Sequence, residues 1–299
     1  MTDTEERIRN DLATQIKEPV RAVRPIPEGH SGFTYWVELD GRRGVLRLPP
    51  PGARIAGPAD IPRQARIMAA LHQQGLPVPA VMAASENPVV DGRPFVLMEV
   101  VQGDRVDQAI DAGSSPLELA VSAVQVLRRF QAVPRENTGI GGEEPMPPQG
   151  EVARWAWLME RAPAELTGQA PRLANLLLER QPQPRPPVLV HGDYHFGNML
   201  FEGGGVAAVV DWEIAQLGQP LLDVCCISLS HVSADAVRDM YGADPADYRW
   251  YLALTHYKYA AIFGYNLMLH RRGKRPDPSY EERTETIRGL IEQGVGVLG

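Results

Sequence analysis

The sequence is poor in cysteine and in lysine. Its two cysteines, Cys225 and Cys226, are adjacent within an apolar run, where we expect buried free thiols rather than a strained disulfide between neighbours. Free thiols are typical of a reducing compartment, and two cysteines are too few for a disulfide framework. Lysine occurs only three times against 27 arginines, a composition bias that bears on the basic residue discussed below.

Long hydrophobic runs and an excess of basic charge are also missing. No apolar run approaches the roughly 20 residues that span a bilayer, and the first ten residues, MTDTEERIRN, lack the apolar core of a signal peptide. The 30 Lys and Arg are outnumbered by 37 Asp and Glu, which gives a net charge of −7. Because nucleic-acid-binding proteins usually carry a basic face, we expect no nucleic-acid partner. From the missing apolar runs and signal peptide we expect a cytoplasmic protein with no membrane segment.

The remaining composition is that of an ordinary globular protein. Apolar residues make up 44% and charged residues 22% of 299 positions, and we find no internal repeat or low-complexity tract. A chain of this length can bury a sizeable core as one large domain or as two lobes.

The most informative stretch is 188–213, VLVHGDYHFGNMLFEGGGVAAVVDWE. Two apolar runs, 199–201 and 206–210, flank a glycine cluster, which predicts a β-hairpin. Asn198 stands just before the first strand and Asp211 just after the second. The hairpin should therefore bring both residues to one open end, beside the loop that carries Asp193.

Three polar groups at one rim suit phosphoryl transfer. Mg²⁺ prefers one or two protein oxygen ligands together with substrate phosphates and water. Two of the three side chains can hold the metal, and the remaining carboxylate can accept a proton from an attacking hydroxyl. The alternative is a purely structural hairpin with polar ends, which would leave the converging carboxylates without a use.

The pattern HGD-x4-N, followed by a hairpin and DWE, resembles the aminoglycoside phosphotransferase family, a branch of the protein-kinase-like fold. The resemblance implies that Asp193 is the catalytic base and that Asn198 and Asp211 are magnesium ligands. It also implies ATP or GTP as phosphoryl donor and a small hydroxylated substrate as acceptor. Asp223 is similar to a family aspartate that braces the catalytic loop, although many members have GDP where this chain has GQP at 218–220.

The N-terminal region carries the nucleotide-binding pattern with two departures. Ser31 and Gly32 belong to a Gly-containing segment entering a strand, which resembles the loop that covers the phosphates. Kinase-like folds then place a lysine on the next strand, paired with a helix glutamate. Here the matching positions carry Arg47 and Gln64. Arg47 can bind phosphate, and Gln64 can hydrogen-bond Arg47 but cannot form the ion pair. The strand string VLR-x-PP also resembles phosphotransferase domains fused to acyl-CoA dehydrogenases.

A strand over 94–101 ends at Gln102-Gly103-Asp104. By the same resemblance this is the hinge between two lobes, where backbone groups of Glu99 and Val101 would bind the purine. We predict an α+β, two-lobe protein-kinase-like fold, with a small antiparallel-sheet nucleotide-binding lobe over 1–101 and a larger, mostly helical catalytic and substrate-binding lobe over 102–299.

An aromatic-rich helical segment over 251–265 leaves two interpretations open. Aromatic residues at helical spacing usually form core, but related phosphotransferases build the acceptor pocket from C-terminal helices. Aminoglycosides, macrolides, choline-like alcohols and hydroxylated acyl metabolites all remain open as acceptors, with a slight preference for apolar ones. The competing function is a catalytically weak or inactive nucleotide-binding module, favoured by Arg47 and Gln64.

Overall fold

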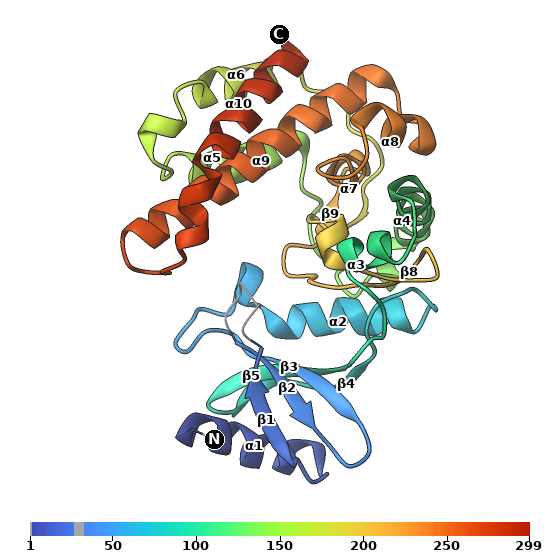
Figure 1. Cartoon of the computed structure of the whole chain (residues 1–299), viewed down its shortest axis with the longest axis vertical. Coiled ribbons are helices and arrows are strands. Elements are labelled where there is room, and N and C mark those ends of the chain that lie inside the picture. The colour runs from blue at the N-terminus through green and yellow to red at the C-terminus, as the bar shows by residue number, and fades with distance from the viewer. Residues whose placement is uncertain (1, 27–32) are drawn as a thin grey trace. The chain divides into compact units, whose positions relative to one another are not determined.

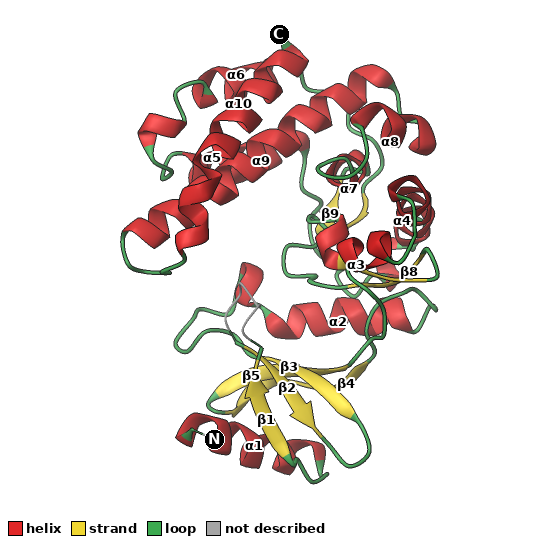
Figure 2. Cartoon of the chain, in the orientation of Figure 1, coloured by secondary structure: helices red, strands yellow, loops and turns green. Residues whose placement is uncertain are grey.

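The computed structural model describes residues 2–26 and 33–299. The chain forms two compact units, each made of two chain segments. Unit 1 contains Met1–Glu143 and His191–Gln216, and unit 2 contains Glu144–Val190 and Leu217–Gly299. Figure 1 labels the elements in chain order, and Figure 2 colours them by type.

Unit 1 is built on an antiparallel sheet of five strands in the order β1-β2-β3-β5-β4. The strands are β1 (Ala22–Pro25), β2 (Thr34–Glu38), β3 (Arg43–Arg47), β4 (Val81–Val90) and β5 (Arg93–Glu99). Central β3 pairs with β2 and β5, so that Arg47 lies between Thr34 and Val96. The sheet therefore holds the end of β3 rigidly from both sides.

Helices α1 (Asp3–Ile16) and α2 (Ile61–His72) cover opposite faces of this sheet (Figure 1). Thr2 caps α1 through a capping box, and Asp60 caps α2, which has proline in its first turn. Leu46 is fully buried in the cluster that includes Ile8 and Leu12 of α1. Because side chains alternate along a strand, Arg47 points to the other face, the side of α2.

The rest of unit 1 surrounds a second, two-stranded ladder. Helices α3 (Val106–Asp111) and α4 (Pro116–Gln131) pack on the hairpin β7 (Met199–Glu202) and β8 (Gly205–Val209). The turn uses Gly203 and Gly204, both with positive φ. Ser122 of α4 accepts a hydrogen bond from the backbone of β8, which fixes the hairpin on this helix.

Unit 2 is mainly helical and centres on the long helix α9 (Pro245–Arg271), against which α5 (Pro148–Met159), α6 (Ala170–Glu179), α7 (Leu221–Ile227), α8 (Ala234–Tyr241) and α10 (Thr284–Leu298) pack. The short strands β6 (Val188–Val190) and β9 (Gln216–Gly218) pair with each other. Cys225 and Cys226 are buried thiols in α7, as expected.

The predicted elements occur, with two omissions. The strand that carries Arg47, the helix that carries Gln64 and the hairpin that follows Asn198 are confirmed. The sequence did not reveal β1 or β9, each too short to carry a pattern of its own. Both α1 and α2 pack on this sheet. The lobe boundary at 101–102 stays a prediction.

None of the helices within residues 2–26 and 33–299 combines the length and apolar character needed to cross a membrane.

Candidate active site

The loop after β6 is shaped by Gly192 and His191. Gly192 has φ of 84°, and a Cβ there would lie 2.7 Å from the carbonyl oxygen of Ile214. His191 is buried, and its Nε2 lies 2.9 Å from the Val210 carbonyl oxygen while its Nδ1 accepts from the Asp193 N–H at 3.2 Å. Burial lowers the pKa of His191 to about 4. The neutral imidazole is therefore a brace between the loop and the strand that precedes Asp211.

Asp193 is in direct contact with Asn198. The Asn198 amide nitrogen donates to the Asp193 Oδ2 atom and to the Asp193 carbonyl oxygen, each at 2.9 Å. His195 adds a further contact, since its Nε2 lies 3.3 Å from the same Oδ2 atom. The His195 Nδ1 accepts the Gly197 N–H, so Nε2 carries the proton that faces Asp193 in the neutral ring. Two donors thus fix one oxygen of this carboxylate.

Asp211 is held next to Asn198 by the backbone. The Asn198 carbonyl oxygen accepts the N–H of Val210 at 2.9 Å, and Asp211 follows with φ of 68°. Trp212 is buried, and its indole N–H donates to the Val209 carbonyl oxygen at 3.1 Å. Its ring packs edge-on against the His191 ring, with 4.6 Å between the ring centroids. The anchored indole fixes the segment on both sides of Asp211.

Arg47 bonds two carboxylates of this segment. Its Nη1 lies 2.8 Å from Asp211 Oδ1, and its Nη2 lies 3.2 Å from Glu213 Oε2. Burial alone would lower the pKa of Arg47, but the charges of Asp211 and Glu213 outweigh it and raise the pKa. Burial and the nearby charge of Asp211 raise the pKa of Glu213 to about 7, although Arg47 opposes this shift. The guanidinium is fully charged and shared between both carboxylates.

Gln64 does not take part in this cluster. It is buried on α2, and its amide nitrogen donates to the Pro58 carbonyl oxygen at 2.9 Å. Its side-chain oxygen has no hydrogen-bond partner among the described residues. The hydrogen bond from Arg47 that the sequence suggested is therefore not made, because Arg47 turns toward Asp211 and Glu213.

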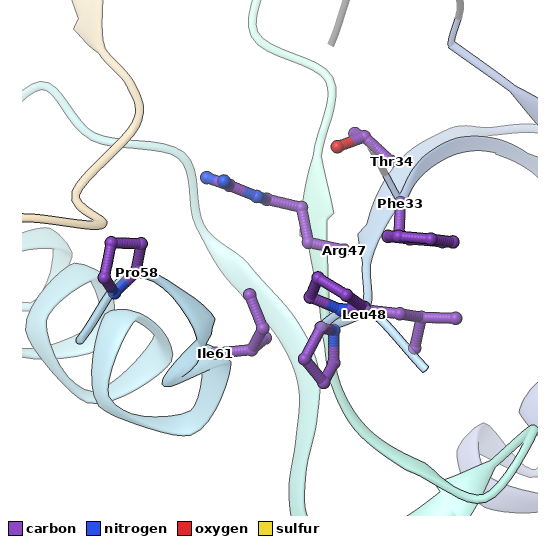
Figure 3. A pocket seen from close by; sticks show the side chains of 8 residues that line it. Phe33, Thr34, Arg47, Leu48, Pro58 and Ile61 are labelled. Carbon is purple, nitrogen blue, oxygen red and sulfur yellow. The ribbon is translucent and has the colours of Figure 1, made fainter. Parts of the chain in front are cut away.

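A small pocket lies at the end of β3, and its described lining residues are Phe33, Thr34, Arg47, Leu48, Pro49, Pro50, Pro58 and Ile61. Figure 3 shows Arg47 extended from the strand, with its guanidinium directed away from Phe33 and Leu48. Among these residues Arg47 alone is charged. Apolar walls next to one cation suit a ligand with an apolar part and an anionic part.

The predicted hinge follows β5 directly. The Glu99 N–H, one of the backbone groups expected to bind the purine, already donates to the Ala80 carbonyl oxygen at 3.0 Å, and the Glu99 side chain accepts the Ala80 N–H at 3.0 Å. Val101 lies just beyond the strand, and its N–H and C=O make no backbone hydrogen bond within the part of the chain that the structure describes. Asp104 then pairs with Phe201 of β7. Ser31 and Gly32, the other predicted nucleotide contacts, lie outside the described residues.

The donor atoms present fit a magnesium ion. The Asn198 amide nitrogen faces Asp193, which leaves its hard oxygen, Oδ1, for another partner. Asp211 would add a carboxylate from the neighbouring chain segment, where its side chain is 35% exposed. One amide and one carboxylate oxygen form the sparse donor set that Mg²⁺ accepts when phosphates complete its shell.

Sequence reasoning missed Glu213 and assigned no chemical role to His195. The DWE string places two carboxylates two residues apart around a buried tryptophan, and this spacing could have indicated that both face one partner. His195 gave no comparable signal, since its contact with Asp193 depends on the turn that continues into Asn198.

The aromatic segment of α9 is mostly core. Tyr251, Tyr257 and Tyr259 are buried, whereas Phe263 and Tyr265 are only partly buried. Burial raises the pKa of Tyr257 to about 12. The sequence preference for an apolar acceptor, which depended on these aromatic rings, therefore loses most of its basis.

Curated relatives match part of their own length. The chain is 32% identical over 235 residues to mouse acyl-CoA dehydrogenase family member 10, covering 76% of this chain and 22% of the relative. It is 28% identical over 224 residues to human acyl-CoA dehydrogenase family member 11, covering 71% of this chain and 28% of the relative. The chain thus spans about a quarter of the length of these proteins.

Solved structures match over nearly the full chain. A Ralstonia eutropha protein described as a candidate aminoglycoside phosphotransferase superposes with a TM-score of 0.77 at 23% identity, covering 98% of this chain and 97% of that one. A thermostable mutant of the aminoglycoside phosphotransferase APH(4)-Ia, solved with ADP and hygromycin B, gives a TM-score of 0.69 at 15% identity, covering 97% of this chain and 98% of that one. These likenesses show the protein-kinase-like fold of the aminoglycoside phosphotransferases.

The sequence model of the phosphotransferase enzyme family matches residues 22–254, which include the whole sheet, the loop of Asp193 and the segment of Asp211. On this match the chain belongs to the phosphotransferase enzyme family.

Proposed function

We propose that this protein is a magnesium-dependent small-molecule kinase that transfers the γ-phosphoryl group of ATP or GTP to a hydroxyl group. The observation that carries the proposal is the contact between Asp193 and Asn198, held beside Asp211, whose carboxylate Arg47 bonds. A base, two oxygen ligands and a cation within one compact unit are the parts that phosphoryl transfer needs. Family membership and the solved complexes with nucleotides are consistent with it.

Each residue would have a distinct task. Asp193 would orient the acceptor hydroxyl and take its proton while the hydroxyl oxygen bonds the γ-phosphorus and the bond to the β–γ bridging oxygen breaks, releasing ADP or GDP. Asn198 and Asp211 would hold Mg²⁺, which supplies charge neutralisation at the phosphates when bound. Arg47 would bind phosphate oxygens, and the backbone N–H and C=O of Val101 would hydrogen-bond the purine of the nucleotide.

Nucleotide binding is the first test. Melting midpoints are measured with Mg-ATP, with Mg-GTP and with each nucleotide in EDTA, because a ligand that binds only the folded state raises the midpoint. We expect a rise of several degrees that requires magnesium, and the more effective nucleotide identifies the donor. No rise at millimolar concentration of either nucleotide would contradict the proposal.

The acceptor can then be sought by mass spectrometry. Two classes come first. Hydroxylated acyl compounds are included because the curated relatives are named as acyl-CoA dehydrogenase family members, and aminoglycosides because APH(4)-Ia and a second neighbour were solved with hygromycin B and kanamycin. A mass increase of one phosphate that requires Asp193 would identify the acceptor class.

A second candidate function is nucleotide binding without transfer. The position of Gln64 favours it, because α2 does not provide the carboxylate that kinase-like folds pair with the strand cation. Magnesium-dependent release of phosphate from the nucleotide, abolished by Asp193→Asn, separates the kinase from the binding module.

A further inference from the structure

Arg47 needs a carboxylate that α2 cannot provide. The helix reads IPRQARIMAALH and contains no acidic residue. Its basic Arg63 instead forms an ion pair with Glu143 and donates to the carbonyl oxygen of Ala215 at 2.8 Å. In this protein α2 thus contributes a basic side chain to its contact with the segment after Asp211. In kinase-like folds the helix contributes an acidic one, the glutamate that pairs with the strand cation.

Glu213 is placed to fill this role. Its Oε2 lies 3.2 Å from Arg47 Nη2, while Asp211 occupies the other terminal nitrogen. Trp212, between them in sequence, is buried and hydrogen-bonded, which fixes both neighbours. The Arg47 side chain is only 12% exposed, so the loss of a carboxylate partner there is costly.

The two carboxylates differ in what happens when a metal-bound nucleotide arrives. On the proposed function Asp211 becomes a metal ligand, and its bond to Arg47 is given up or shared. Glu213 then remains as the protein anion that holds the guanidinium toward the phosphates. Without Glu213, Arg47 would hold Asp211 more tightly and oppose its release to the metal.

We propose that Glu213 is the positioning residue for Arg47, taking the place of the helix carboxylate that Gln64 does not supply. The inference rests on the proposed function and adds a residue to it. It requires that Glu213 act through Arg47, and a double-mutant cycle on nucleotide affinity measures this dependence.

The cycle compares wild type, Glu213→Gln, Arg47→Met and the double variant by calorimetry at pH 8, with the magnesium complex of the better nucleotide. We expect Glu213→Gln to raise the Kd about tenfold in the wild-type background and less than twofold in the Arg47→Met background. The matched control is Glu18→Gln, because Glu18 also pairs with an arginine, Arg42, and its side chain is 26% exposed against 27% for Glu213. Its Kd should stay within twofold of wild type.

Every result decides the inference. Equal affinity of Glu213→Gln and wild type overturns it and leaves the proposed function standing. A full tenfold loss in the Arg47→Met background also overturns it, because Glu213 would then act on metal or nucleotide by itself. Absence of nucleotide binding by wild type overturns the proposed function and this inference with it. Melting midpoints of each variant establish that it is folded.

Discussion

Two segments of this protein concentrate side chains capable of chemistry, and they use them in opposite ways. In residues 191–213 the polar groups bond one another: Asn198 donates to Asp193, and His191 joins Val210 to the Asp193 backbone. In α9 most of the aromatic side chains are buried in the core. The Trp250 indole N–H donates to the Leu177 carbonyl oxygen, and its ring packs on Tyr251. What the polar groups contact thus separates the candidate site from α9, and richness in such residues is not enough.

Removal of the Asp193 carboxylate should give the largest effect. Asp193→Asn keeps the size of the side chain but cannot accept a proton, so magnesium-dependent phosphate release from the nucleotide should fall about 10³-fold. Nucleotide affinity by calorimetry should stay near that of wild type. A variant that retains turnover would end the claim that the first segment is catalytic.

The converse substitution in α9 should change stability alone. Leu254 is buried, and Leu254→Ala should lower the free energy of unfolding by about 3 kcal/mol, measured in urea. Below the unfolding transition, the Kd for nucleotide should match wild type. Weaker nucleotide binding by the folded variant would show that α9 contributes to the site after all.

Asp211 should affect affinity only when metal is present. We expect Asp211→Asn to raise the Kd of the magnesium–nucleotide complex about 30-fold, roughly 2 kcal/mol, and to change the affinity measured in EDTA little. The pair of titrations is the measurement. An equal loss in both would mean that Asp211 serves Arg47 and not the metal.

A smaller effect concerns the dependence of the free energy of unfolding on pH, to which a buried histidine of each segment contributes. Burial lowers the pKa of His191 and of His256 to about 4, below the value near 6.5 in the unfolded chain. Such groups contribute stability that is complete above pH 6.5 and is lost as the pH falls toward 4. His256→Leu should therefore remove about 1 kcal/mol of the stability loss between pH 7 and 5.5. An unchanged pH dependence of urea unfolding would contradict this prediction.

Much of the fold and part of the site could be predicted because the signals are local. The glycines of the hairpin turn and the spacing from Asp193 to Asn198 each lie within a few residues. The Arg47–Glu213 pair joins positions 166 residues apart, and no pattern in either segment names the other. The strand β1 has only four residues, and it forms because it can pair with the edge of β2.

The left-handed backbone of Asp211 limits which residues this position can hold. A φ of 68° is adopted readily by glycine, asparagine and aspartate and at a cost by other side chains. Glutamate at position 211 would keep the charge, but its side chain is one methylene longer and the left-handed backbone conformation is unfavourable for it. Sequence change that preserves this turn is therefore confined to aspartate, asparagine and glycine, so the loop can gain or lose this carboxylate by single substitutions without being rebuilt.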